Sequence, residues 1–329
     1  MTEIVAADIG GTHARFAIAE VAAGRVVRLG DPVILRAGDF AGLAPAWAAF
    51  AATLGRPLPR LAGIAVAAPP GAIYKFTNSD WVVRPEALKA DLGLDDFVLI
   101  NDFAAVAHAV AHAVAHAVAG LDATHFRTVT GPAGALASVR HTSIIGPGTG
   151  LGVAQLLRDG GHYHVIATEG GHIGFSPVDA IEAQVAARIA ARHGRCSIER
   201  LVSGAGLAAI AGTLADNAGT ALPLRDDKAL WIAALAGDDP LLDAAIDIFC
   251  RIWGSITGDL AVAHGAEAVV LAGGIGARLG PRLAASGFAA RFIAKGRYTD
   301  RMAALPVQQI IHAEPGLYGA AAALAGAMA

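Results

Sequence analysis

Two turns made of glycine and threonine, each set between two apolar runs, are the residues with the clearest chemical use in this chain. The first turn is Asp8-Ile9-Gly10-Gly11-Thr12 and the second is Gly148-Thr149-Gly150-Leu151-Gly152. Glycine lets a backbone approach a ligand closely, and successive N–H groups in such turns form concavities that bind phosphate. Because an apolar run resumes after each turn, we expect two hairpins that face a polyphosphate, on two lobes of shared ancestry. The alternative for either turn is an ordinary hairpin.

Neither turn matches the better-known nucleotide motifs. The pattern Gly-x-x-x-x-Gly-Lys-Ser/Thr is absent, which excludes a P-loop NTPase. A dinucleotide fingerprint needs glycines at i, i+2 and i+5, but the i+5 positions after Gly148 and Gly274 hold Val153 and Leu279. Asp8 ends the first apolar run, where it is placed to hold Mg²⁺ through water, since that ion prefers hard oxygen ligands.

A carboxylate also follows the apolar run of residues 97–100. Asn101-Asp102 ends this run and opens an alanine-rich segment. Ligands in α/β sheets lie beyond the carboxyl ends of the strands, where a carboxylate can accept a hydroxyl proton as a general base. The alternative is that Asp102 only caps the helix that follows.

The turn Thr168-Glu169-Gly170-Gly171-His172 offers a carboxylate and an imidazole. These groups suit the discrimination of vicinal hydroxyls, and the alternative is a plain Gly-Gly turn with two solvated side chains. The spacing His-Glu-x-x-His is absent, which excludes that zinc-protease site. Glu199 stands at a helix start, where a carboxylate can be merely a partner of the helix dipole, so the sequence alone does not single it out.

The tetrapeptide Ala-His-Ala-Val occurs three times in succession from Ala107 to Val118. It places His108, His112 and His116 on one face of a helix, a spacing that can bind a transition metal. No Asp or Glu accompanies these histidines, so we interpret the repeat as duplicated helical turns that expose imidazoles to solvent.

The bulk composition is that of a globular protein. Of the 329 residues, 55% are hydrophobic and 16% are charged, which excludes a disordered chain and suggests about two domains. The net charge of −3, without long runs of one sign, argues against a nucleic-acid or membrane partner. Cys196 and Cys250 form no CxxC pair and no signal-peptide pattern opens the chain, so we expect a cytoplasmic protein without a thiolate metal site.

Strands alternate with helices along the chain, which predicts an α/β protein. The segment 103–121 lacks charged residues and approaches the length of a membrane span. Its alanines contribute little transfer energy and its histidines are costly in a bilayer, so we predict a buried or half-buried helix. Strands are predicted over residues 1–36, 61–67, 97–100, 142–157, 164–168, 268–272 and 307–311, and helices over 40–54, 85–92, 103–121, 180–193, 199–214, 229–236, 241–263 and 315–328.

Together these residues resemble the bacterial glucokinase family, the ATP-dependent hexokinases of the actin-like sugar kinase superfamily. The resemblance covers nearly the whole chain and rests on the order and spacing of the motifs, since no single motif is decisive. The motifs are ADIGGTHARF (7–16), INDF (100–103), GPGTGLGV (146–153), EGGH (169–172), SIER (197–200), SG (203–204), GGI (273–275), SGF (286–288), KGR (295–297) and PGL (315–317).

The resemblance implies a fold, an activity and partners. The fold would be α/β, a two-lobed actin-like (ribonuclease H-like) ATPase with mixed sheets flanked by helices and a cleft between the lobes. Residues 1–118 would form a small lobe to which a C-terminal helix of residues 316–329 returns, and residues 119–315 a large lobe. The activity would be ATP-dependent phosphorylation of D-glucose at the 6-hydroxyl, with Mg²⁺, by a homodimer.

The resemblance also implies roles for individual residues. Asp102 would be the base that deprotonates the 6-hydroxyl. The sugar would be contacted by Asn78, Asn101, Asp102, Glu169, His172 and Glu199. ATP would be held by Asp8 near Mg²⁺, by Gly10, Gly11, Thr12, Gly148, Thr149 and Gly150 at the phosphates, and by Gly273 and Gly274 at adenosine.

Two features depart from the pattern of that family. Gly174 stands where the family usually has an acidic residue, which puts the support of the sugar site in doubt, and the Ala-His-Ala-Val repeat is longer than usual. Two other functions stay open. A sugar-sensing regulator would need a basic helix-turn-helix extension, and none precedes Asp8. A kinase for mannose, fructose or a non-sugar acid would share the same fold.

Overall fold

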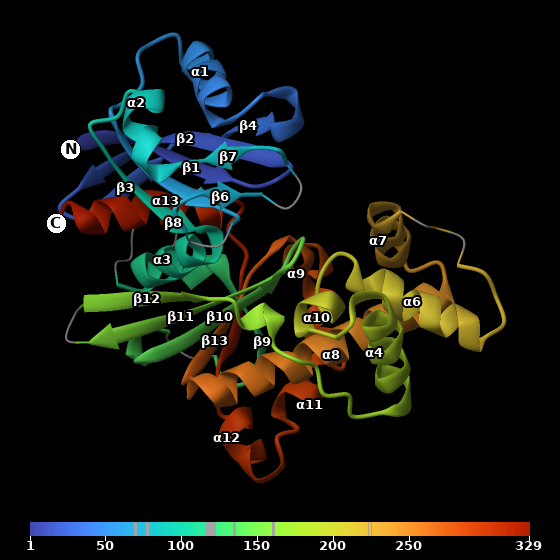
Figure 1. The fold of residues 1–329 in the computed structure, drawn as a ribbon. Coiled ribbons are helices and arrows are strands. Elements are labelled where there is room, and N and C mark those ends of the chain that lie inside the picture. Colours follow the sequence, from blue (N-terminus) through green and yellow to red (C-terminus); the bar gives the residue numbers. More distant parts are fainter. Residues whose placement is uncertain are drawn as a thin grey trace. The chain divides into compact units, whose positions relative to one another are not determined.

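The computed structural model describes residues 1–68, 71–76, 79–115, 123–133, 136–159, 162–222, 224 and 226–329. The chain divides into two units, each with a large sheet (Figure 1). The first unit comprises Met1–His125, Val165–Ala167 and His312–Ala329, and the second comprises Phe126–His164 and Thr168–Ile311.

The large sheet of the first unit has the strand order β3-β2-β1-β5-β8, with β4 also paired to β2. β1 runs antiparallel to β2 and parallel to β5, which runs parallel to β8. The carboxyl ends of β1, β5 and β8 therefore share one edge. The strands are β1 (Thr2–Ile9), β2 (His13–Ala22), β3 (Arg25–Leu29), β4 (Val33–Arg36), β5 (Leu61–Val66) and β8 (Asp96–Asn101), beside a separate pair, β6 (Tyr74–Lys75) and β7 (Val82–Val83).

The sheet of the second unit repeats this pattern in the order β12-β11-β10-β13-β14-β9. β10 runs antiparallel to β11 and parallel to β13, which runs parallel to β14. The matching strand order supports two lobes of shared ancestry, and the α/β class predicted from the sequence is confirmed. The strands are β9 (Phe126–Thr130), β10 (His141–Pro147), β11 (Leu151–Asp159), β12 (His162–Thr168), β13 (Ala268–Leu271) and β14 (Val307–Ile310).

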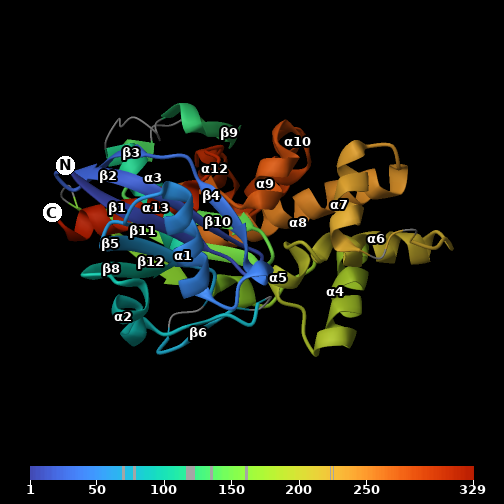
Figure 2. The same cartoon turned by 90° about the horizontal axis from the view of Figure 1, so that it is seen from above.

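Helices cover both faces of the first sheet (Figures 1 and 2). Alternate residues of β1 and β5 bury bulky side chains against Trp47 and Phe50 of α1, whereas Ala65 on the opposite face packs with Ala105 of α3 and Ala320 of α13. This is the period of two expected for a sheet buried on both sides. The helices are α1 (Leu43–Leu54), α2 (Leu88–Leu92), α3 (Asp102–Ala115) and α13 (Pro315–Ala327).

Small residues let α13 approach its neighbours closely. A Cβ on Gly319 would overlap the carbonyl oxygen of Ala105 in α3, and a Cβ on Gly63 in β5 would overlap the carbonyl oxygen of Ala320. Glycine is therefore required where this helix meets α3 and the sheet. Ala320–Ala322 are completely buried, so the last helix belongs to the core of the first unit.

The core of the second unit is centred on the longest helix, α8. Its Phe249 and Trp253 are fully buried and make edge contacts with Trp231 of α7 and Phe288 of α11. Such contacts contribute beyond the burial of area alone. The helices of this unit are α4 (Ala180–His193), α5 (Ile198–Leu201), α6 (Gly206–Asn217), α7 (Asp227–Ala236), α8 (Pro240–His264), α9 (Gly274–Leu279), α10 (Pro281–Ala285), α11 (Phe288–Ile293) and α12 (Thr299–Ala303).

The alanine-rich segment after Asp102 is a buried helix, as predicted, over residues 102–115. Ala105, Ala107 and Ala109 of α3 are completely buried, and residues 116–121 of the predicted helix lie outside the described residues. Among the described helices, none combines the length and the apolarity that crossing a bilayer requires.

Candidate functional site

The first Gly-Thr turn joins β1 to β2 as a hairpin. The Gly10 N–H donates to the His13 carbonyl over 2.9 Å, and the Thr12 carbonyl accepts from the Ala37 N–H over 2.9 Å. Among the described residues, the N–H groups of Gly11 and Thr12 have no hydrogen-bond acceptor, and Thr12 is exposed. Two successive N–H groups beside a threonine suit the binding of an anion.

The second Gly-Thr turn joins β10 to β11 in the same manner. The Gly148 N–H donates to the Gly150 carbonyl over 2.8 Å, and the Gly148 carbonyl accepts from the Gly204 N–H over 2.9 Å. Thr149 is exposed at the tip, and across the described residues the amides of Thr149 and Gly150 have no acceptor. Both predicted hairpins are confirmed, and each presents the same pair of N–H groups.

Asp8 lies opposite Arg15 in the first hairpin. Arg15 Nη1 is 3.8 Å from Asp8 Oδ2, and Arg15 Nε is 3.2 Å from Glu314 Oε2. A Cβ on Gly316 would lie 2.7 Å from Asp8 Oδ2, so the Asp8 carboxylate packs against the first turn of α13. Burial raises the pKa of Asp8, and the Arg15 guanidinium acts against that rise.

The surroundings of Asp8 fit a Mg²⁺ ion that is held jointly with phosphates. In such sites the ion keeps several waters and takes one or two carboxylates beside the substrate phosphates. A buried carboxylate with a raised pKa gains from a nearby cation. In the described part of the chain, no cluster of three His, Cys, Asp or Glu side chains could hold a metal ion by itself.

Asn101 and Asp102 lie where β8 passes into α3. Asn101 Oδ1 accepts from the N–H groups of Phe103, at 2.9 Å, and Ala104, at 3.3 Å, so Asn101 is the cap of α3. The expectation that Asp102 is the cap is wrong by one residue, because β8 extends through Asn101. Asp102 is the first helical residue, and its Oδ1 accepts from the Phe103 N–H over 2.9 Å.

Glu169 precedes the short 3-10 turn η5 (Gly170–His172), and His172 is its last residue. Their side chains are 56% and 62% exposed, and His172 Nε2 is 3.7 Å from Glu169 Oε2. A Cβ on the buried Gly171 would lie 2.5 Å from the carbonyl oxygen of Leu151. The turn therefore packs directly on the first residue of β11, next to the second Gly-Thr turn.

Glu199 lies in α5 and reaches the same place. The Ile198 N–H donates to the Ile173 carbonyl over 3.0 Å, which fixes the start of α5 beside η5. Glu199 Oε2 accepts from the Leu151 N–H over 3.1 Å. The turn η5, which carries Glu169 and His172, and the side chain of Glu199 thus both contact Leu151, the residue after the second turn.

Gly174 pairs with Ser197 in an isolated β-bridge next to this cluster. The Arg195 guanidinium is 3.9 Å from the position of a Cβ on Gly174, and its Nη2 donates to the His172 carbonyl over 2.9 Å. A cation therefore stands within reach of position 174, and in this chain it holds the backbone of η5.

Gly273 and Gly274 follow β13 at the edge of the sheet where β10 ends. Gly273 has a φ of +85°, and a Cβ there would overlap the Pro147 carbonyl oxygen. Only glycine allows both this conformation and this approach. The two glycines lie beside the strand that leads into the second Gly-Thr turn.

The predicted site residues thus form one group in each unit. The first group is Asp8, Gly10, Gly11, Thr12, Asn101 and Asp102, and the second is Gly148, Thr149, Gly150, Glu169, His172, Glu199, Gly273 and Gly274. Asn78, predicted to contact the sugar, lies outside the described residues.

The interpretation of the histidine repeat as solvent-exposed is wrong for the two histidines that the structure describes. His112 is 2% exposed, its Nε2 accepts from the Val26 N–H over 3.2 Å, and its Nδ1 is 3.0 Å from the Tyr318 hydroxyl. Burial lowers the pKa of His108 to about 4. α13 packs against α3 and brings Tyr318 to His112, so this face of the helix is covered. His116 lies outside the described residues.

Sequence reasoning missed the ion pairs of Arg15 and the contact of Arg195. The pair of Arg15 with Asp8 could have been predicted from the sequence, since a hairpin that turns at Gly10–Thr12 places Arg15 across from Asp8. No local pattern predicts the pair of Arg15 with Glu314, because only the return of α13 to the first sheet brings Glu314 near Arg15.

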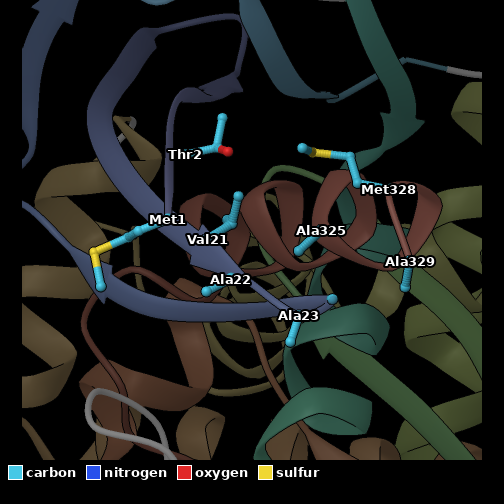
Figure 3. Close-up of a pocket in the computed structure, with 9 residues that line it drawn as sticks. Met1, Thr2, Val21, Ala22, Ala23, Ala325, Met328 and Ala329 are labelled. Atoms are coloured by element: carbon cyan, nitrogen blue, oxygen red, sulfur yellow. The ribbon is translucent and has the colours of Figure 1, made fainter.

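A pocket of about 480 Å³ in the first unit carries no candidate chemistry (Figure 3). Its lining has no titratable side chain and consists of Met1, Thr2, Val21, Ala22, Ala23, Gly24, Ala325, Met328 and Ala329. We therefore take the two groups described above, each within its own unit, as the candidate functional residues.

Comparison with known proteins gives matches along the whole chain. The family model described as Glucokinase matches residues 5–327. A glucokinase of Zymomonas mobilis is 51% identical over 324 residues, with 98% of each chain covered. The crystal structure of a glucokinase from an Antarctic psychrotroph, 30% identical, has a TM-score of 0.80 and covers 98% of this chain and 99% of its own.

A more distant solved structure shares the fold. It is a ROK family glucokinase from Streptomyces griseus in complex with glucose and AMPPNP, which is 20% identical, has a TM-score of 0.63 and covers 97% of this chain and 98% of its own. The matching strand order of the two units, the paired Gly-Thr hairpins and the full-length matches agree, and the chain belongs to the glucokinase family.

Proposed function

We infer that this protein transfers the γ-phosphoryl group of ATP to the 6-hydroxyl of D-glucose, which yields ADP, glucose 6-phosphate and a proton. The observation that carries this inference is 51% identity to a glucokinase over 98% of both chains. The glucose and AMPPNP bound by the Streptomyces griseus relative support the choice of substrates. The two hairpins with paired N–H groups suit the phosphates of ATP.

We assign the role of general base to Asp102. Phosphoryl transfer requires in-line positioning and charge stabilisation more than covalent help from the protein. As the bond from O6 to the γ-phosphorus forms and the bond to the leaving ADP oxygen breaks, the carboxylate of Asp102 takes the hydroxyl proton. The Asn101 cap supports this role because it fixes the first turn of α3, where Asp102 stands.

The remaining predicted residues divide into a sugar group and a nucleotide group. Carboxylate, amide and imidazole side chains are suited to sugar hydroxyls, and we assign these contacts to Asn78, Asn101, Asp102, Glu169, His172 and Glu199. We assign the phosphates to Gly10, Gly11, Thr12, Gly148, Thr149 and Gly150, and adenosine to Gly273 and Gly274. A Mg²⁺ ion bound near Asp8 would neutralise charge on the phosphates.

The division of the chain into lobes, its oligomeric state and its location in the cell are also proposals. We propose a small lobe of residues 1–118 with the returning helix 316–329, and a large lobe of residues 119–315. The membership of α13 in the first unit supports this division. Lobe closure would keep water from competing with the sugar for ATP. We propose a cytoplasmic homodimer, in keeping with the resemblance to the family.

A coupled assay of ADP release tests the activity. The protein is supplied with Mg²⁺ and ATP over glucose, mannose, fructose, N-acetylglucosamine and no sugar. We expect turnover that depends on glucose. Turnover with another sugar alone would move the specificity and direct attention to Gly174 and Arg195, and retained ATP binding without turnover on any sugar would refute the assignment.

A further inference from the structure

The second Gly-Thr turn is tied to a side chain that the proposed function assigns to the sugar. Glu199 Oε2 accepts from the Leu151 N–H, and Leu151 is the residue that directly follows Gly148–Gly150. Leu151 is 5% exposed, so water cannot readily replace this acceptor. A Cβ on Gly150 would overlap Glu199 Oε2, which shows how closely the carboxylate lies against the turn.

The other ties of the turn are backbone bonds. Gly148 donates to Gly150 within the turn, and Gly204 donates to Gly148 from the start of the α6 region. The Gly204 carbonyl in turn accepts from Trp231 Nε1 over 2.8 Å. Among the described residues, Glu199 is the side chain that hydrogen-bonds to the segment from Gly148 to Leu151.

We propose that Glu199 is a positioning residue for the nucleotide, which holds the phosphate turn in its binding conformation and couples it to the sugar. This proposal rests on the proposed function. With Oε2 fixed on the Leu151 N–H, the other oxygen of the carboxylate can accept from a sugar hydroxyl. A sugar that orders this carboxylate orders the turn, and by linkage a bound nucleotide favours the sugar to the same extent. Preorganised N–H groups bind a phosphate without the cost of ordering the turn.

Glu169 provides a matched comparison within the same cluster. Both carboxylates are assigned to the sugar, but Glu169 is 56% exposed and its carboxylate lies beside His172, not beside the turn. Removing Glu169 should therefore weaken glucose alone, whereas removing Glu199 should weaken glucose and nucleotide.

The experiment measures binding of Mg–AMPPNP without sugar and of glucose without nucleotide, by calorimetry on the full chain. We expect Glu199→Ala to weaken AMPPNP about tenfold, the size expected for a lost hydrogen bond to a charged acceptor. Glu169→Ala should leave AMPPNP within about twofold of the parent, a change too small to reflect a lost hydrogen bond. Glu199→Gln keeps an oxygen acceptor for the Leu151 N–H and should restore most of the AMPPNP affinity.

Gly150→Ala gives an independent test in which residue 199 is still glutamate. The three heavy atoms nearest to the added Cβ all belong to the flexible Glu199 side chain, with Oε2 the nearest, so we expect the fold to be retained while the carboxylate is pushed off the turn. We expect AMPPNP to weaken by a similar factor. Unchanged or tighter AMPPNP binding in Gly150→Ala and Glu199→Ala would overturn the proposal.

The two proposals fail in different ways. Glucose-dependent turnover by the parent, with AMPPNP binding unchanged in the variants, would refute the positioning role of Glu199 and keep the activity. Absence of turnover by the parent on any sugar, with AMPPNP weakened in the variants, would refute the activity and keep the positioning role of Glu199.

Discussion

A carboxylate at the first turn of a helix can serve the helix or a substrate, and Asp102 is the residue where this choice matters. Replacing it by Asn keeps the oxygen that accepts from the Phe103 N–H and removes the basic site. If Asp102 takes the 6-hydroxyl proton, kcat should fall by about 10²–10⁴, the usual contribution of general acid–base catalysis. AMPPNP affinity should stay near that of the parent.

The control for Asp102→Asn is Asp96→Asn on the same strand. The Asp96 carboxylate is 68% exposed and pairs with Lys89 at the surface, so its loss should leave kcat unchanged. A kcat for Asp102→Asn within a few-fold of the parent would remove Asp102 from the chemical step.

The buried His108 should make stability depend on pH. Burial lowers its pKa from 6.5 to about 4. Between these two pH values His108 is therefore protonated in the unfolded chain and neutral in the folded chain. The contribution of His108 to the free energy of unfolding is fully present above pH 6.5 and is lost as the pH falls toward 4. Between pH 7.5 and pH 5 the loss should be about 2 kcal/mol.

Urea unfolding at pH 7.5 and pH 5 measures this effect as a difference between the parent and His108→Leu. The variant should lose about 2 kcal/mol less than the parent over this interval, whereas His162→Gln, a change at an exposed histidine, should follow the parent. Equal losses in parent and His108→Leu would show that His108 titrates normally in the folded state.

Single residues were predicted from the sequence where the signal was local. Gly10–Thr12 and Gly148–Gly150 carry their turn chemistry in adjacent positions, so both hairpins were found. The sequence suggested Asp102 as the cap of α3, but the cap is Asn101. The boundary between β8 and α3 is set by the pairing of β8 with β5, which extends to Asn101. The exposure of His112 was misjudged because α13, which buries it, lies far along the chain.

At the scale of elements, the contact between α3 and α13 depends on the absence of one side chain. A methyl group on Gly319 would overlap the Ala105 carbonyl oxygen, a backbone atom that cannot move without shifting α3. We expect Gly319→Ala to lower the free energy of unfolding by about 1–3 kcal/mol, as overpacking of a core does.

Gly38→Ala is the matched control for that substitution. Nothing lies within 4 Å of a Cβ at Gly38, so the change should be neutral or slightly stabilising through the unfolded chain. Chemical denaturation followed by circular dichroism compares the two variants. A Gly319→Ala protein as stable as the parent would mean that α13 can move away from α3 without loss.

Elements with both a periodic pattern and local end signals were predicted well. α4 was predicted over residues 180–193 and is observed there, because Asp179 caps its first turn and Gly194 ends it in a left-handed conformation. β9 and the short helices α9, α10, α11 and α12 were missed. β9 has only five residues and is defined by its pairing with β14, so its signal is tertiary.

At the scale of the whole molecule, the first unit needs both ends of the described chain. α13 packs on α3, β1 and β5, and its Leu317 and Tyr318 are completely buried. Deleting residues 315–329 should therefore abolish cooperative folding of the first unit, since α3 alone cannot bury the apolar area that α13 covers on this face of the sheet.

Removal of only Met328 and Ala329 is the control, because both side chains are exposed. Expression in the soluble fraction and amide hydrogen exchange would report the outcome, with loss of protection expected in β1 and β5 for the longer deletion alone. Protection of these strands without α13 would show that the first sheet is stable by itself. The paired topology of the two sheets was inferable from the repeated turns, whereas the return of α13 was suggested by resemblance and not by any local pattern.

The bonds of His112 have a consequence for the order of events during synthesis. This imidazole joins the Val26 amide to the Tyr318 hydroxyl, so the core of the first unit is completed by a segment that is translated after the second unit. Roughly 190 residues separate His125 from His312, and at typical elongation rates they take about 10–40 s to translate. All of the second unit is therefore translated before α13, and until α13 is made the nascent first sheet lacks the helix that packs on β1 and β5.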